Sequence, residues 1–248
     1  MLEKKNYGAD ILRNIRRFSE VNEQRDIKPL MATSFPGTHC PLMGVLMTVR
    51  QLPEAVTVIV GTDECSYYTK SLTLSDRYGG INGRCVSVVL NSHDVTFGSA
   101  ESMHKAFKEI VAEYRPKCVM LVTTCVIEVI GDDYDAIAEE LTKQYSIPVM
   151  AVHTEHFKCE DHFPGFERAI TACQSIMQPQ EGDGSVNVLG QRFGDFADTE
   201  LYALLQKSGV KIGVQLPSGC TSDDIRHAPA AKVNIVVNDI ALPLAQAM

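Results

Sequence analysis

The strongest constraint on the fold is an apolar run that ends close to a cysteine, in the sequence KCVMLVTTCVIEVIGDD from Lys117 to Asp133. Cys118 to Val122 are apolar and rich in β-branched side chains, which is typical of a strand buried on both faces of a parallel sheet. Cys125 follows this strand after two threonines. It therefore falls at the carboxyl end of the strand, where open α/β sheets bind their ligands. We expect a site at Cys125.

The residues after Cys125 predict a turn and a helix. Gly131 with Asp132 and Asp133 is typical of a tight turn, and the helix is expected from Tyr134 to Tyr145. Adjacent carboxylates are compatible with acid–base catalysis. Their place at a helix N-terminus favours a capping role instead, because the positive end of the helix dipole stabilises them.

Strands and helices alternate along the rest of the first part of the chain. This alternation predicts an α/β fold with Rossmann-like parallel sheets and helices on both faces. After a helical lead-in over residues 1–30, the expected strands are 56–60, 84–90 and 149–152, and the expected helices are 44–50 and 99–114. Pro41 is expected to hold Cys40 in an extended conformation.

A second alternating unit follows the polar linker QPQEGDGS from Gln178 to Ser185. Strands are expected at 186–189, 211–216 and 233–237, with a helix over 199–208 and a short helix capped by Thr221. We predict a first domain over 1–178 with the candidate cysteines, and a partial second α/β domain over 179–248. This second domain is expected to be incomplete, because a doubly wound sheet usually has more strands.

Charge and hydropathy limit the kinds of partner that this chain is expected to have. The chain has 23 basic and 31 acidic residues and a formal net charge of −8, which argues against a nucleic-acid partner. No run reaches the roughly 18 apolar residues that a membrane helix needs, and the N-terminus has no apolar signal core. We therefore expect a cytoplasmic protein without a membrane partner, in which the eight cysteines do not form a disulfide framework.

Three cysteines, Cys40, Cys65 and Cys125, lie in expected loops beside buried elements, and two of them follow strands. We call them the three candidate thiols. Their separations of 25 and 60 residues are too wide for a zinc knuckle with paired ligands. Thiolates that converge from neighbouring strand ends suit an iron–sulfur cluster. Three thiolates leave one corner open, which a second subunit would fill at an interface. The alternative is that they are inert buried thiols.

A rival set of metal ligands lies in the sequence HTEHFKCEDH. His153, His156, Cys159 and His162 recur at every third position, and imidazole with thiolate is a good zinc set. This spacing drifts around an α-helix, so a polar loop at the mouth of a cleft is the alternative interpretation. His153 or His156 would then be available as a proton donor. Cys85, Cys118 and Cys173 are expected to be packing residues.

Residues 36–165 resemble the first domain of the nitrogenase component 1 family. That family includes nitrogenase subunits, cofactor-assembly scaffolds and dark-operative protochlorophyllide reductase subunits. The resemblance rests on PGTHCPLMG, GTDECSYY, DVTFGSAESMHKAFKEI, TTCVIEVIGDDYDAIAEEL and IPVMAVHTEHF, while TELYALLQKSGVKI and VNIVV resemble the family's second domain. It implies that Cys40, Cys65 and Cys125 bind an interface iron–sulfur cluster, most simply of the four-iron type, within a dimer.

The sequence departs from the family's dinitrogen-reducing members. In those proteins a cysteine that binds the large catalytic cofactor follows the strand matched by VNIVV, whereas this chain has Val237, Asn238 and Asp239. The loop after His153 also lacks a matching catalytic histidine and has PGFERA from Pro164 to Ala169. Dinitrogen reduction is therefore not expected, and the catalytic residues and substrate stay unassigned.

The sequence also lacks a phosphate loop. Gly79, Gly80 and Gly83 are followed by Arg84, which indicates a turn and not a G-x-x-x-x-G-K-[ST] motif. We therefore expect this chain to bind no nucleotide. The resemblance implies two partners: a second component 1-like subunit of the same or a different sequence, and an ATP-dependent reductase similar to the nitrogenase iron protein.

Three functions follow from these observations. The first is a nitrogenase-like oxidoreductase subunit that passes electrons from the reductase through the cluster to a substrate. The second is a non-catalytic cofactor-assembly scaffold. The third is a cluster-free interaction module.

Overall fold

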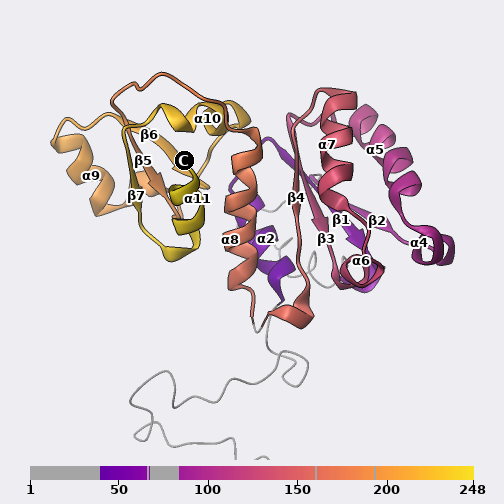
Figure 1. Cartoon of the computed structure of the whole chain (residues 1–248). Helices are drawn as coiled ribbons and strands as arrows, with labels where there is room; N and C mark the ends of the chain where they lie inside the picture. The colour runs from indigo at the N-terminus through magenta and orange to yellow at the C-terminus, as the bar shows by residue number, and fades with distance from the viewer. Residues whose placement is uncertain (1–39, 66, 68–83, 160, 193) are drawn as a thin grey trace, which may run out of the picture.

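The computed structural model describes residues 40–65, 67, 84–159, 161–192 and 194–248. The expected helical lead-in and the glycine turn before Arg84 lie outside these ranges. Figure 1 shows two parallel sheets side by side, with the long helix α8 between them. None of the helices in the described ranges is long and apolar enough to span a bilayer.

The first sheet has four parallel strands in the order β2-β1-β3-β4. The central pair is completely buried, as the apolar runs predict. The strands are β1 (Ala55–Gly61), β2 (Cys85–Val89), β3 (Cys118–Thr123) and β4 (Val149–Val152).

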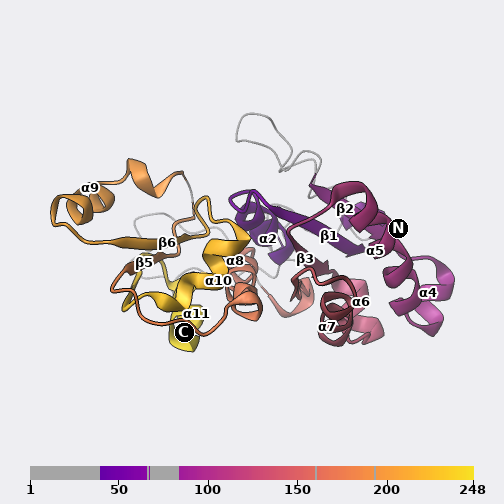
Figure 2. The ribbon, with the colours of Figure 1, turned by 90° about the horizontal axis from the view of Figure 1, so that it is seen from above.

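Helices cover both faces of this sheet, which confirms the predicted α/β fold. On one face, α5 (Ala100–Tyr114) and α7 (Tyr134–Tyr145) pack in a cluster with inward side chains of β1 and β3. On the other face lie α2 (Pro41–Val49) and α8 (Phe163–Ala172). The short helices α4 (Ser92–Phe97) and α6 (Cys125–Ile130) follow β2 and β3. Seen from above, the two pairs of helices lie on opposite sides of the strands (Figure 2).

The second sheet is also parallel, in the order β6-β5-β7. Its strands are β5 (Val186–Leu189), β6 (Ile212–Leu216) and β7 (Val233–Val236), and its helices are α9 (Glu200–Lys207), α10 (Ser222–His227) and α11 (Leu242–Ala247). Short 3₁₀ turns complete the described chain: η5 (His156–Lys158), η6 (Cys173–Ile176), η7 (Phe196–Asp198), η8 (Ala228–Ala230) and η9 (Asp239–Ala241).

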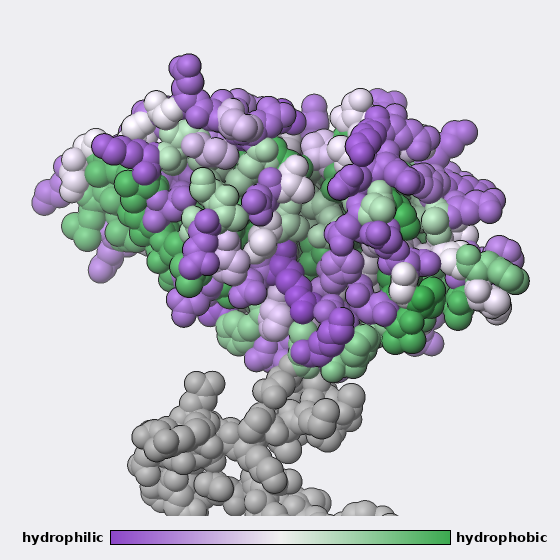
Figure 3. Space-filling view, viewed as in Figure 1, coloured by the Kyte–Doolittle hydropathy of each residue, from purple (hydrophilic) through white to green (hydrophobic). Residues whose placement is uncertain are grey.

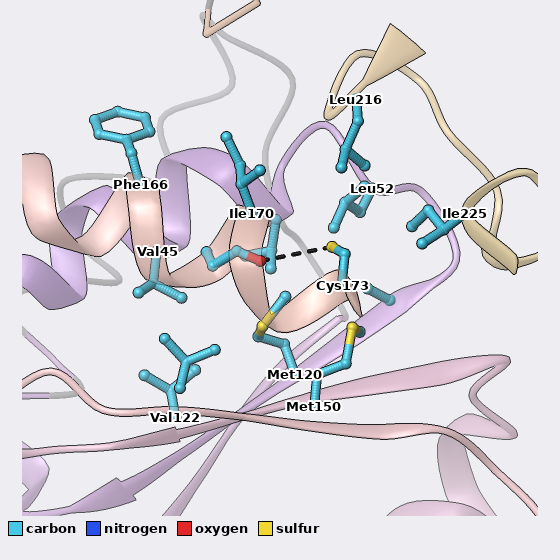
Figure 4. Packing of buried hydrophobic residues seen from close by; sticks show 14 of the residues in the cluster. Val45, Leu52, Met120, Val122, Met150, Phe166, Ile170, Cys173, Leu216 and Ile225 are labelled. Atoms are coloured by element: carbon cyan, nitrogen blue, oxygen red, sulfur yellow. Dashed lines mark hydrogen bonds between the residues drawn. The ribbon is translucent and has the colours of Figure 1, made fainter. Parts of the chain in front are cut away.

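One hydrophobic core joins the two sheets. Figure 4 shows Met120 and Met150 from the first sheet, Ile170 and Cys173 from the chain between the sheets, and Leu216 from the second sheet in the same cluster. The proposed boundary between residues 178 and 179 falls in the segment that links η6 to β5, and it stays a prediction.

The expected strands agree with the structure, whereas four helices differ: α4 and α6 were not expected, and the other two are α2 and α8. Gly44 does not begin a helix, because α2 starts at Pro41, where the missing N–H of proline costs no hydrogen bond. Gly44 instead lies at the contact between α2 and α8, where a Cβ atom would overlap the carbonyl oxygen of His162. The segment from Pro164 to Ala169, expected as a loop, belongs to α8.

Candidate functional site

Two of the three candidate thiols follow neighbouring strands. Cys65 lies in the helical turn after β1, and Cys125 is the first residue of α6 after β3. The two strands run parallel, with Val60 opposite Thr123, so both chain segments leave the sheet at the same edge. The predicted place of Cys125 at a strand end is therefore confirmed, although the helix that it begins was not expected.

A close contact joins the two segments. The main-chain N–H and the hydroxyl of Thr124 both donate to the carbonyl oxygen of Val60, over 3.1 and 3.0 Å. Gly61 permits this approach, because a Cβ atom there would overlap the hydroxyl oxygen of Thr124. Cys125, the next residue, is thereby held close to the end of β1.

Cys40 reaches the same place from the start of α2. It has the extended conformation predicted from Pro41, with φ −79° and ψ 167°, and both Cys40 and Cys65 pack against the core that α2 and α8 share. Burial raises the pKa of the Cys40 thiol, hydrogen bonds from Met43 and Leu42 oppose the rise, and the neighbouring thiols Cys65 and Cys125 add to it. Cys40 therefore lies near enough to both Cys65 and Cys125 for those thiols to act on it electrostatically.

The three candidate thiols fit a cluster better than a single ion. Within the described ranges, no group of three or more histidine, cysteine, aspartate or glutamate side chains is compact enough to hold one metal ion. An iron–sulfur cluster takes each thiolate on a different iron and so spaces its ligands further apart. The donor chemistry also fits, because each residue offers a thiol and the sulfur of Cys125 accepts a hydrogen bond from the main-chain N–H of His156 over 3.2 Å.

The segment from His153 to His162 does not form the zinc site considered above. His153 lies between two carboxylates, with Nδ1 2.8 Å from Glu128 and Nε2 3.1 Å from Asp135. Burial alone would lower the pKa of His153, but the two carboxylates outweigh it and raise this pKa. The ring of His162 packs on Phe163 at the start of α8, with centroids 4.9 Å apart.

A part-buried ion pair holds the same segment from the other side. Arg168 of α8 donates to Glu155 and to the carbonyl oxygen of His153, both over 2.8 Å. Burial would raise the pKa of Glu155, but its own main-chain N–H, Arg168 and Lys158 lower it. These groups line a cavity of about 530 Å³ beside β4. Glu128, Glu155 and Arg168 could not be predicted as members of this group from the sequence, because no local pattern distinguishes them from surface charges.

Most of the remaining cysteines are packing residues. Cys118 and Cys173 are buried as predicted, and burial raises the pKa of each to about 12, while Cys85 is half-buried. Burial also raises the pKa of Cys220, whose thiol donates to the carbonyl oxygen of Gln215. The raised pKa values of Cys118, Cys173 and Cys220 disfavour the thiolate form that a nucleophile needs.

The adjacent carboxylates before α7 have structural roles, which agrees with the capping interpretation. Asp133 caps α7 by accepting from the main-chain N–H of Ala136 over 2.9 Å. Asp132 turns instead to Ser99, the residue before α5, and accepts from its main-chain N–H over 2.7 Å. The pair therefore joins α7 to α5.

Comparison with known proteins identifies the family. Residues 40–248 match the family model described as nitrogenase component 1 type oxidoreductase. The chain belongs to this family. The match confirms the resemblance found in the sequence, and it covers both sheets and all three candidate thiols.

Individual relatives agree with this assignment. The chain is 30% identical over 203 residues to the nitrogenase iron-molybdenum cofactor biosynthesis protein NifE of Clostridium pasteurianum. The aligned residues cover 79% of this chain and 44% of the relative. It is 24% identical over 246 residues to the nitrogenase molybdenum-iron protein alpha chain of Methanosarcina barkeri, covering 92% of this chain and 44% of the relative. The chain thus spans less than half the length of these relatives.

A solved structure has the same fold. The structure titled "Nitrogenase Cp1 at pH 6.5" matches with a TM-score of 0.66 and 23% identity, over 81% of this chain and 41% of the matched chain. The likeness confirms the parallel α/β architecture.

Proposed function

We propose that this chain is a subunit of a component 1-type oxidoreductase that holds an iron–sulfur cluster on Cys40, Cys65 and Cys125. The observation that carries this proposal is that Cys65 and Cys125 follow neighbouring parallel strands to one sheet edge, where Thr124 holds the end of β3 against the end of β1. Both thiols also lie near enough to Cys40 to act on it electrostatically. A four-iron cluster is the simplest that three thiolates from one chain can help to bind. The cluster would supply one-electron transfer.

A second component 1-like subunit, of the same or a different sequence, would bind at this edge. Large apolar side chains stand exposed after each strand of the first sheet, and such a group is a mark of an interaction surface. They are Tyr67, Phe97, Val129 and Phe157, with exposed fractions of 77%, 76%, 74% and 52%. Figure 3 shows apolar side chains at the lower right of the molecule, where α4 and α6 lie in Figure 1. We call these four residues the apolar rim.

Electrons would come from a separate ATP-dependent reductase similar to the nitrogenase iron protein. The chain itself has no G-x-x-x-x-G-K-[ST] sequence with which to bind the phosphates of ATP. All eight cysteines are free thiols, which suits the reducing cytoplasm where we propose that the complex works.

Dinitrogen is not the proposed substrate. The place after β7 where the cofactor thiol is expected by resemblance holds Val237 and Asn238, and the Asn238 side chain accepts a hydrogen bond from the main-chain N–H of Ile240. An amide engaged in a cap is a poor substitute for a thiolate ligand of a metal cofactor.

A cofactor-assembly scaffold is the second candidate. It is favoured by the 30% identity to a protein named for iron-molybdenum cofactor biosynthesis. The two functions differ in their products: the oxidoreductase turns over a substrate when the reductase and ATP are supplied, whereas the scaffold delivers a metal precursor to another protein. A cluster-free interaction module would do neither.

The first experiment is to measure iron and sulfide in anaerobically purified protein and to record an electron paramagnetic resonance (EPR) spectrum after reduction with dithionite. We expect about two to four irons per chain, depending on how the cluster is shared. Alanine variants of Cys40, Cys65 and Cys125 should lose this iron, and Cys85→Ala should retain it. Iron-free wild-type protein would support the interaction module, and candidate-thiol variants that keep their iron would overturn the assignment.

A further inference from the structure

The segment that follows β4 is held by contacts to two other elements. The hydroxyl of Thr154, a buried residue, donates to the carbonyl oxygen of Thr123 at the end of β3 over 2.5 Å. Arg168 of α8 donates to the carbonyl oxygen of His153 and to the carboxylate of Glu155, each over 2.8 Å. Residues 153–155 are thus each tied to β3 or α8, so the fold sets the direction of the next main-chain N–H.

That N–H belongs to His156, and it donates to the sulfur of Cys125 over 3.2 Å. The two residues are 31 positions apart and follow the neighbouring strands β4 and β3. Cys40 differs, because its sulfur accepts from N–H groups of its own helix, those of Leu42 and Met43. The donor to Cys125 therefore depends on tertiary packing, and it can be removed without a change to any of the three candidate thiols.

A hydrogen bond to a cysteine sulfur affects how easily a cluster on that sulfur is reduced. An N–H donor stabilises negative charge on the thiolate that it contacts. Reduction adds one electron to an iron–sulfur cluster, so a donor to a ligating sulfur stabilises the reduced form more than the oxidised form. Such a donor raises the reduction potential.

We infer that the main-chain N–H of His156 raises the reduction potential of the cluster by donating to Cys125, and that Thr154 and Arg168 are positioning residues for this donor. This inference rests on the proposed function, because it requires a cluster on Cys125. Thr154 and Arg168 act through the main chain of the segment, since their side chains bind the carbonyl oxygens of Thr123 and His153. The segment after β4 thereby sets how readily the cluster accepts an electron.

The test removes the N–H donor alone. His156 is the first residue of the 3₁₀ turn η5, where proline fits, and Glu155 before it is already extended, with φ −62° and ψ 104°, as proline requires of its predecessor. His156→Pro therefore deletes the N–H at little cost to the backbone, whereas the control His156→Ala keeps the N–H and deletes the imidazole.

The midpoint potential of each protein is measured by redox titration of anaerobically purified protein, followed by EPR. We expect a more negative potential in His156→Pro and the wild-type potential in His156→Ala. Iron and sulfide contents and the thermal unfolding midpoint are measured for the same samples.

Thr154 provides a second measurement that does not depend on the proline variant. Thr154→Val removes the hydroxyl that binds the carbonyl oxygen of Thr123, at nearly constant volume, and Thr154→Ser retains a hydroxyl. We expect the potential of Thr154→Val to shift in the same direction as that of His156→Pro, by a smaller amount, and Thr154→Ser to keep the wild-type value. A merely structural role would lower the unfolding midpoint of Thr154→Val without a change in potential.

The outcomes separate this inference from the proposed function. Iron-free wild-type protein would overturn both. An iron-containing His156→Pro protein with the wild-type potential, or an equal shift in His156→Ala, would overturn the role of the His156 N–H and leave the cluster on the three candidate thiols. If His156→Pro binds no iron, Thr154→Val decides, and a wild-type potential in that variant would overturn the inference.

Discussion

The hydroxyl of Thr124 donates a hydrogen bond to the carbonyl oxygen of Val60 over 3.0 Å, although 64 positions separate the two residues. Because Cys125 follows Thr124 directly and Cys65 lies in the turn after β1, this contact sets how closely the two thiols approach. It depends on Gly61, which leaves room for the threonine side chain.

Gly61→Ala is expected to displace Thr124 and with it Cys125. The added methyl group would overlap the threonine hydroxyl, and relieving such an overlap typically costs about 1–3 kcal/mol. We expect a lower free energy of unfolding and reduced iron content. Gly182→Ala is the matched control, because the atom nearest to a Cβ there is 4.0 Å away. Full iron content and unchanged stability in Gly61→Ala would contradict this account of the contact.

Arg168→Met is expected to destabilise the segment that carries His156. The substitution leaves the carboxylate of Glu155, whose side chain is 8% exposed, without its main partner. A buried group left in this way costs about 1–3 kcal/mol. Denaturant unfolding should show this loss in Arg168→Met and a loss below about 1 kcal/mol in Arg226→Met, whose partner Asp223 is 69% exposed. Equal losses in the two variants would mean that the pair of Arg168 with Glu155 contributes no more to stability than the surface pair of Arg226 with Asp223.

His153 is expected to titrate above its ordinary pKa because Glu128 and Asp135 favour the imidazolium. Glu128→Gln should lower this pKa, since burial then opposes a weaker attraction. The His153 resonances, followed by nuclear magnetic resonance against pH, measure the change. The control Glu139→Gln removes a carboxylate that pairs with Lys143 at the surface, and it should leave the His153 titration unchanged.

The contact of His153 with Glu128 also predicts how the stability of the protein depends on pH. A raised pKa in the folded state means that the stabilising contribution of His153 is complete below its unfolded pKa of about 6.5 and is lost as pH rises through the folded value. The stability difference between wild type and Glu128→Gln should therefore be largest in mildly acidic solution. A stability difference that grows toward alkaline pH would contradict the conclusion that Glu128 raises the pKa of His153.

Val129→Asp is expected to weaken association through the apolar rim. Val129 is 74% exposed on α6, the helix that begins with Cys125, and a carboxylate buried in an interface is costly. Where the second subunit is another copy of this chain, sedimentation equilibrium should show a shift from dimer to monomer. Leu204→Asp is the control, because Leu204 is 61% exposed on α9 of the second sheet. An unchanged mass of Val129→Asp, or the same shift in Leu204→Asp, would show that the apolar rim is not part of the subunit interface.

The sequence by itself determined the class of fold and the place of two candidate thiols. Apolar β-branched runs such as Cys118 to Val122 predict buried parallel strands, and residues that follow such strands must lie at the carboxyl edge of a sheet. Local signals also predicted the cap at Thr221, which the structure confirms with a capping box over Asp224. These features depend on neighbours within a few positions of the chain.

Tertiary structure alone decided the contacts between distant segments. Gly44 looked like a helix start because glycine often interrupts helices, yet it is there to let α8 approach α2. His153 looked like a metal ligand by spacing, but the fold brings Glu128 and Asp135 to it across gaps of 25 and 18 residues. Periodicity and propensity report the direction of a side chain relative to its own helix or strand. Which partner it meets depends on the order and packing of whole elements, and no local pattern encodes that.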